Sequence, residues 1–168
     1  MKKQIILSLA PVACALLAGC VSRNEMAMDT VGPEPATSAV STSNSGTLIV
    51  YSAYDPSADF NKRDVMRPEY TDYRILTVDG QLFKRVHNNT GSMQQRALPQ
   101  TLSQGKYEVV AQADGNGVVT VPVTVEAGKT TVVHLEGGNT WSADPRPADA
   151  EAAHLPDGTI IGWKARMD

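Results

Sequence analysis

Cysteine is almost missing from this 168-residue sequence, and its two copies, Cys14 and Cys20, both lie close to the N-terminus. The long remainder of the chain therefore contains no thiol, which excludes thiol catalysis, cysteine-ligated zinc and disulfide bonds in that part. Any domain that folds there must be stabilised by its hydrophobic core.

Histidine and basic residues are also too sparse to suggest metal or nucleic-acid chemistry. The three histidines, His87, His134 and His154, do not lie at metal-ligand spacing from one another, and the formal net charge is −3. No basic stripe is present that would attract a polyanion. A Gly-x-Ser-x-Gly nucleophile elbow is missing as well. We therefore expect no metal, no cofactor, no nucleic-acid partner and no enzymatic activity.

The chain also lacks a hydrophobic run long enough to span a bilayer. After Lys2 and Lys3, the apolar segment extends from Ile5 to about Gly19, whereas a spanning helix needs roughly 20 residues. A short positive segment, an apolar core and small residues before a cleavage point are the parts of a secretory signal. We therefore expect residues 1–19 to be a signal peptide.

The end of this segment, Leu17-Ala18-Gly19-Cys20, resembles the lipobox of bacterial lipoproteins. In that family the cysteine thiol receives diacylglycerol, the signal peptide is cut before the cysteine, and the new amine is acylated. The resemblance implies that Cys20 is lipidated and anchors the chain, since several acyl chains give stable membrane binding. Val21 stands where many such lipoproteins carry an inner-membrane aspartate, so an outer-membrane position facing the periplasm is implied. The alternative is an ordinary soluble secreted protein.

Residues 20–46 have the composition of a tether. From Val21 to Gly46 the sequence is rich in Ser, Thr, Pro and Gly, and its apolar residues show no period. Such a segment buries too little surface to offset its ordering entropy, so we expect it to be disordered. With about 26 residues, its r.m.s. reach is ~25–30 Å.

Short strands separated by turn residues are predicted from Thr47 onward. Four valines, at positions 119, 121, 123 and 125, alternate with other residues, which predicts a strand with one buried face. Pro122 within that strand predicts a sheet edge, or a missing N–H that points outward. The other predicted strands cover Thr47 to Ala53, Asp72 to Val78, Gln81 to Val86, Lys106 to Ala113 and Thr130 to Gly137. No segment has the period of an amphipathic helix, so we expect an all-β fold, an antiparallel β-sandwich of about seven strands.

The segment from Leu102 to Gly137 resembles the second half of a carboxypeptidase-regulatory-like domain, also called transthyretin-like or prealbumin-like. The matching features are Leu102, Gly105, Tyr107, Val109, Gly115 or Gly117, Val119 to Val125, Gly128 and Val132 to Leu135. Asp79-Gly80 fits the hairpin turn found early in that family. The resemblance covers about residues 47–137 and implies a prealbumin-like sandwich without catalytic residues. The segments 54–71 and 87–100 are longer than usual turns, and we expect the particular properties of this protein to lie there.

Residues 138–168 form a C-terminal extension in which we expect a β-hairpin. Pro156-Asp157-Gly158 is a turn sequence, and the segment that follows, Thr159 to Ala165, is too apolar for a free tail. We expect it to form a strand that docks on the sandwich through Ile161 and Trp163, which share one face of a regular strand. The alternative is a strand that binds a partner.

Two functions remain open on the sequence alone. The first is a non-enzymatic, lipid-anchored module of the cell envelope, used for structural or protein–protein contact. The second is a carbohydrate- or peptidoglycan-binding accessory domain in which Trp141 and Trp163 stack on sugar rings. No motif identifies the partner as a particular envelope protein or cell-wall glycan.

Overall fold

The computed structural model of the protein describes residues 28–35, 44–54, 70–88, 96–137 and 151–166. Within these residues the chain forms ten strands and no helix. The strands are β1 (Val31–Gly32), β2 (Ser45–Tyr51), β3 (Tyr73–Thr77), β4 (Leu82–Val86), β5 (Gln100–Ser103), β6 (Gly105–Ala113), β7 (Gly117–Val125), β8 (Thr130–His134), β9 (Ala152–His154) and β10 (Ile160–Lys164).

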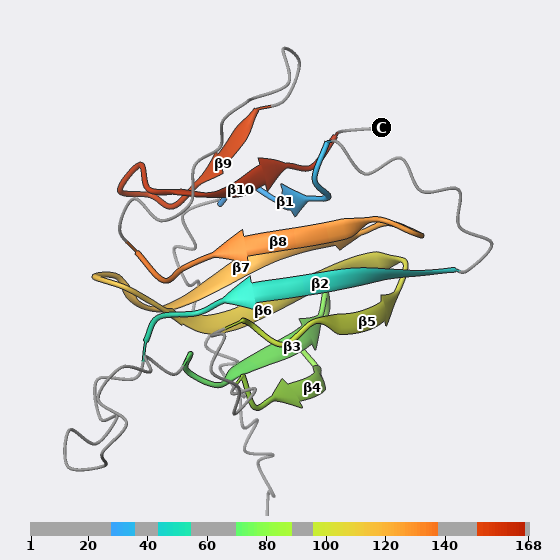
Figure 1. Ribbon diagram of the computed structural model, residues 1–168, viewed down its shortest axis with the longest axis horizontal. Coiled ribbons are helices and arrows are strands. Elements are labelled where there is room, and N and C mark those ends of the chain that lie inside the picture. Colours follow the sequence, from blue (N-terminus) through green and yellow to red (C-terminus); the bar gives the residue numbers. More distant parts are fainter. Residues whose placement is uncertain (1–27, 36–43, 55–69, 89–95, 138–150, 167–168) are drawn as a thin grey trace, which may run out of the picture.

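The strands form two layers, as predicted. The larger sheet has seven strands in the order β4-β3-β6-β7-β1-β10-β9, and the smaller sheet has three in the order β5-β2-β8. Figure 1 shows β2 and β8 lying over β6 and β7, with the β3–β4 hairpin at one end of the larger sheet and β9 and β10 at the other. The all-β sandwich is therefore confirmed, although β1 and β5 were not predicted and β2 pairs with β8 in parallel.

The β6–β7 hairpin forms the centre of the larger sheet. Its register places Val109 opposite Val121 and Tyr107 opposite Val123. The predicted valine face is confirmed, because Val121 and Val123 are fully buried. The core between the sheets also contains Leu48, Val50, Ile75, Val86, Leu102, Val125, Val133, Leu135 and Ile161.

The N-terminal part of the described chain belongs to the fold. Val31 pairs in parallel with Val123 of β7 and antiparallel with Lys164 of β10, and its side chain is 0% exposed. The next residues then reach the smaller sheet, where Pro33 bridges Thr131. The prediction of a disordered tether is thus wrong for residues 28–35. A segment without its own hydrophobic period is ordered here because neighbouring strands supply its hydrogen bonds.

Pro122 lies in an interior strand, so the prediction of a sheet edge is wrong. β7 is flanked by β6 on one side and β1 on the other. β1, however, pairs with β7 at Val123 alone. Because β1 is so short, it accepts few hydrogen bonds from the backbone N–H groups of β7. An interior strand can therefore contain a proline, which has no N–H.

The C-terminal hairpin joins the sandwich as predicted, although β10 is not the regular strand that was expected, because its register with β9 shifts between Ile160 and Gly162. β9 and β10 pair antiparallel, and β10 joins the larger sheet through β1. Ile161 is fully buried and Trp163 is 8% exposed. The sandwich therefore extends beyond residues 47–137 and includes strands from both flanking segments.

Candidate functional site

β4, which forms one edge of the larger sheet, is the most exposed strand of the described fold. β4 pairs with β3 and has no second neighbour among the described residues. Its residues 82–85 are exposed, including Leu82 at 50% and Phe83 at 52%. Such an edge presents unpaired backbone N–H and C=O groups together with apolar side chains.

A register irregularity explains why Phe83 stands out. Ile75 lies opposite Lys84, and the next residue, Leu76, lies opposite Leu82, so Phe83 has no partner across the strand pair. Its ring contacts the ring of Tyr107, with centroids 5.5 Å apart and a 60° tilt. An extra residue of this kind re-aims a side chain and increases the local twist. Phe83 thus keeps one side packed and the other open.

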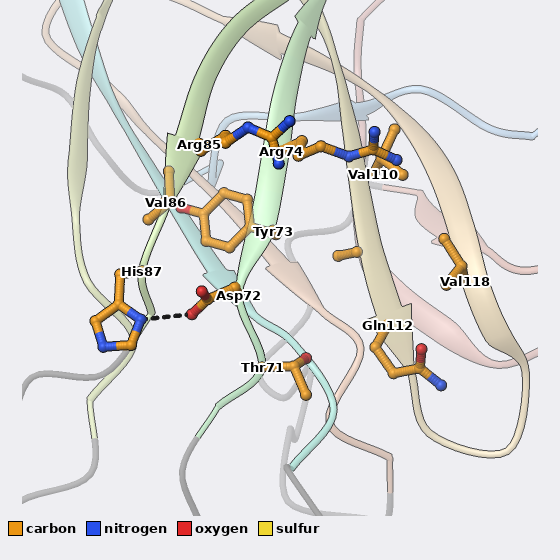
Figure 2. A pocket seen from close by; sticks show the side chains of 11 residues that line it. Thr71, Asp72, Tyr73, Arg74, Arg85, Val86, His87, Val110, Gln112 and Val118 are labelled. Carbon is orange, nitrogen blue, oxygen red and sulfur yellow. Dashed lines mark hydrogen bonds and ion pairs between the residues drawn. The ribbon is translucent and has the colours of Figure 1, made fainter.

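Two arginines lie side by side next to this edge. Arg74 of β3 and Arg85 of β4 are direct partners in the antiparallel register, and both side chains are exposed. Figure 2 shows them in a row that runs from β4 across β3 towards Val110. Like charges directly opposite each other destabilise a sheet. Neither guanidinium forms a salt bridge within the described part of the chain.

The arginines line a shallow pocket of about 490 Å³ on the outer face of the larger sheet. Val110, Gln112 and Val118 form its other side (Figure 2). His87 and Asp72 lie at one end, with His87 Nδ1 2.8 Å from Asp72 Oδ1. The pocket is open and mixed in character, since it combines apolar side chains with cationic ones. It therefore suits a surface contact better than enclosure of a small substrate.

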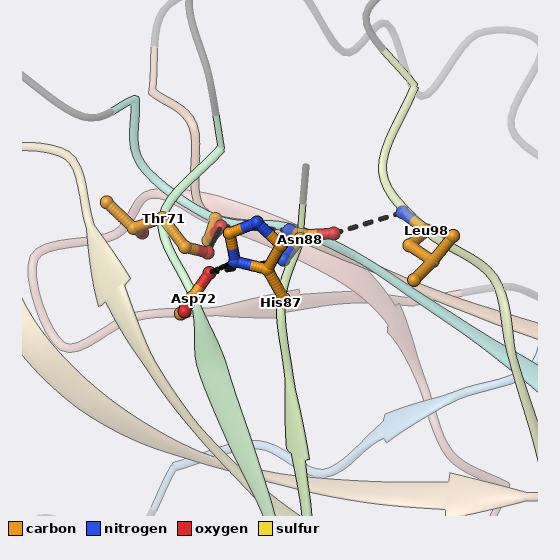
Figure 3. Close-up of polar contacts among 6 residues, drawn as sticks. Thr71, Asp72, His87, Asn88 and Leu98 are labelled. Atoms are coloured by element: carbon orange, nitrogen blue, oxygen red, sulfur yellow. Dashed lines mark hydrogen bonds and ion pairs between the residues drawn. The ribbon is translucent and has the colours of Figure 1, made fainter. Parts of the chain in front are cut away.

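The end of β4 is held by Asn88, whose side chain is buried. Its Nδ2 donates to the carbonyl oxygen of Val50 at 2.9 Å and to Ser52 Oγ at 3.0 Å. Its Oδ1 accepts a hydrogen bond from Leu98 N at 3.0 Å (Figure 3). One side chain thus ties the end of β4 to the smaller sheet and to the segment that leads into β5. This rigid attachment fixes the position of the β4 edge.

A second cluster of polar and aromatic side chains lies where β2 and β8 end. His134 stacks on Tyr51 with ring centroids 4.8 Å apart, and His134 Nδ1 lies 2.8 Å from Glu136 Oε1. Tyr70 packs against both Tyr51 and Tyr54. Burial, followed by a hydrogen bond with Tyr54, raises the pKa of Tyr70 well above its usual range. The side chains of this cluster contact one another, which is typical of a structural role.

The residues proposed from the sequence are distributed as follows. Cys20 and Trp141 lie outside the described residues. Trp163 is buried in β10, so its ring does not present a face for sugar stacking, which argues against it as a binding residue. His154 Nδ1 lies 3.9 Å from Asp29 Oδ2, and Lys164 Nζ lies 3.0 Å from Oδ1 of the same carboxylate.

The residues of the β4 edge were missed by sequence reasoning, although one signal was present. The segment Leu82-Phe83-Lys84-Arg85 mixes apolar and basic residues without the alternation of a half-buried strand. A strand that lacks this alternation is typical of an edge. The pairing of Arg74 with Arg85 required the register, which the sequence alone does not provide.

Comparisons of the chain with protein-family models, curated proteins and solved structures found no match. Both family resemblances, to bacterial lipoproteins and to carboxypeptidase-regulatory-like domains, therefore stay predictions. None of the described segments forms an apolar helix of membrane-spanning length. Within the described residues, no three His, Cys, Asp or Glu side chains come together as a metal site.

Proposed function

We propose that this protein is a lipid-anchored, non-enzymatic component of the bacterial cell envelope that binds another protein through the exposed β4 edge. Cys20 is the proposed lipid attachment site, and the outer membrane, on its periplasmic face, is the proposed location. The observation that carries the binding role is an edge strand with half-exposed apolar residues, Leu82 and Phe83, and with no second neighbouring strand among the described residues.

The position of this edge relative to the proposed anchor supports the assignment. The described fold begins at Met28, eight residues after Cys20, so at most about 29 Å of extended chain separates them. β1, which follows directly, lies four strand positions from β4 in the larger sheet. At ~4.8 Å per strand, this places β4 roughly 19 Å further across the sheet. β4 is thus at one end of the sheet, whereas β1, which follows the proposed anchor in the sequence, lies towards the other end, next to β10 and β9 (Figure 1).

A protein partner fits this edge better than a glycan does. Backbone groups and apolar side chains in one exposed strand are the elements of strand addition, in which main-chain hydrogen bonds supply affinity. Trp163, one of the two tryptophans considered for sugar stacking, is buried.

The membrane anchor is tested by labelled palmitate in cells that express the wild-type protein or Cys20→Ser. We expect loss of label and release from the membrane fraction in the variant, and equal labelling would contradict the anchor. The binding role is tested by a photo-crosslinking amino acid at Phe83, with the exposed Glu151 as the control position. We expect discrete protein adducts from position 83 that position 151 does not give. Identical adduct patterns from the two positions would contradict binding at β4.

A further inference from the structure

We infer that the partner contributes an extended acidic segment, which adds to β4 as an additional strand and places a carboxylate over Arg74 and Arg85. This inference rests on the proposed function, because it specifies the chemistry of the partner at the same edge. Three observations carry it: the backbone of β4, which has no second neighbour among the described residues, the arginine pair, which forms no salt bridge there, and the apolar residues of the same strand.

The backbone of β4 selects for an extended chain. β3 occupies one side of β4 through the register from Tyr73–Val86 to Leu76–Leu82. The hydrogen-bonding groups that point to the other side have no partner strand among the described residues. A free anion or a lipid headgroup can contact the arginines but cannot satisfy a row of N–H and C=O groups, whereas a strand satisfies them all.

The charge of the edge selects for acidic side chains. Arg74 and Arg85 project on the outer face, and Lys84, the neighbour of Arg85 in β4, is exposed as well. The nearby carboxylate of Asp72 is paired with His87. Carboxylates match arginine forks bidentately, and such charge-assisted hydrogen bonds are among the stronger ones in proteins. An acidic residue on a strand next to β4 would also relieve the repulsion between the two arginines.

The same charges exclude a second copy of this chain. Pairing two β4 strands would bring Lys84 and Arg85 of one copy close to those of the other, and like charges across a strand pair are unfavourable. Basic residues on an edge strand are a known device against such self-association. An acidic partner strand would instead be attracted by Lys84 and Arg85. The basic charge of β4 therefore favours an acidic partner over a second copy of this chain.

Apolar positions complete the specification. Leu82 lies on the same strand pair as Arg85, opposite Leu76, and is half exposed. Phe83 contacts Tyr107 through part of its ring, and the rest of its side chain is exposed. The fitting segment therefore combines acidic residues, which reach the arginines, with apolar residues, which cover Leu82 and Phe83.

The test measures binding of labelled peptides of about ten residues to the detergent-solubilised full-length lipoprotein by fluorescence anisotropy. The probes are a peptide of alternating Asp and Val, its Lys and Val counterpart, and the Asp/Val peptide with alternate backbone nitrogens methylated. We expect only the unmodified acidic peptide to bind, because it alone has both the charge and the donors. Hydrogen exchange should show slower exchange of the β4 amides in its presence.

The variant Arg74→Gln/Arg85→Gln should weaken that binding at least about tenfold, since charge-assisted hydrogen bonds are lost. Both side chains are exposed, so the fold should persist, and Lys129→Gln is the matched control for removal of a surface cation. Equal binding of the acidic and basic peptides, or equal binding of the methylated peptide, would overturn the inference. Displacement by inorganic phosphate alone, or dimer formation on sedimentation, would overturn it too. Crosslinks from Phe83 in cells, combined with no binding of the acidic peptide, would overturn this inference and leave the proposed function standing.

Discussion

Val31 packs directly against the bare backbone of Gly162. A Cβ atom at position 162 would lie 2.7 Å from Val31 Cγ1 and 2.8 Å from the carbonyl oxygen of Val132. Three elements, β1, β10 and β8, therefore meet at a glycine because no side chain fits between them. The contact joins the N-terminal segment, the C-terminal hairpin and the smaller sheet.

We expect Gly162→Ala to lower the free energy of unfolding by about 1–3 kcal/mol, the usual cost of overpacking. A backbone carbonyl cannot rotate away as a flexible side chain can, so β10 must shift. The measurement is the urea midpoint of the purified protein, with Val118→Ala, at an exposed position, as the control. A midpoint for Gly162→Ala equal to the wild type would show that β10 does not approach β8 this closely.

Val31→Ala tests whether the segment before residue 36 contributes to the core. The substitution removes two buried methyl groups, so we expect a loss of about 1–3 kcal/mol from transfer and cavity effects. Val78→Ala, an exposed valine in the turn after β3, should change the stability by less than about 0.5 kcal/mol. If both substitutions had equally small effects, residues 28–35 would belong to the disordered tether that the composition predicted.

The parts of the fold that sequence could predict are those that local patterns determine. The valines of β7 alternate from Val119 to Val125 with a glycine-containing turn before them, and Gly115 and Gly117 take the positive φ values that such a turn requires. The same reasoning located the hairpin at Gly80 and the docked strand β10. In each case, residues that are close together in the sequence determine both the hydrophobic period and the turn.

The parts that could not be predicted depend on distant partners. β1 has two residues and exists because β7 and β10 lie on either side of it. The arginine pair at the candidate site is likewise a product of register, since Arg74 and Arg85 are separated by a hairpin with an irregular pairing. Hydrophobic period carries no information on which strands meet, and a shift of one residue would move Arg85 to the other face.

Asn88 is expected to be the most sensitive polar residue near the β4 edge. Asn88→Ala leaves the Val50 carbonyl and the Leu98 amide without their described partner. Each buried group that loses its hydrogen bond costs about 1–3 kcal/mol, so we expect a total loss of at least about 2 kcal/mol. Denaturation midpoints measure this loss, and amide exchange at the end of β4 should become faster.

His87→Ala is the matched control for this substitution, because His87 is the neighbouring residue and its contact with Asp72 is exposed. Surface ion pairs contribute about 0–1 kcal/mol. A larger effect for His87→Ala than for Asn88→Ala would show that the surface pair, rather than the buried amide, holds the end of β4.

Tyr73 gives the protein a predictable sensitivity to alkali. Its ring is in the core, and its hydroxyl has no hydrogen-bond partner within the described part of the chain. Burial raises the pKa of Tyr73 well above its usual range. The unfolded chain loses this proton near pH ~10, while the folded protein retains it. Above that pH the unfolded state therefore binds fewer protons than the native state, so stability falls as pH rises. The contribution is complete below pH ~10 and is lost progressively above it.

Tyr73→Phe should remove that part of the alkaline loss while leaving stability at neutral pH equal or slightly higher, since an unsatisfied buried hydroxyl disappears. Urea midpoints at about pH 7 and about pH 11 measure both effects. A reduced loss, rather than a complete removal, is expected because burial also raises the pKa of Tyr70. The control is Tyr107→Phe, whose hydroxyl donates to the carbonyl oxygen of Ser103 at 3.0 Å, so its removal should cost about 1 kcal/mol at neutral pH. If Tyr73→Phe instead destabilised the protein at neutral pH as much as Tyr107→Phe does, the hydroxyl of Tyr73 would have a partner, and the alkaline effect assigned to it would not follow.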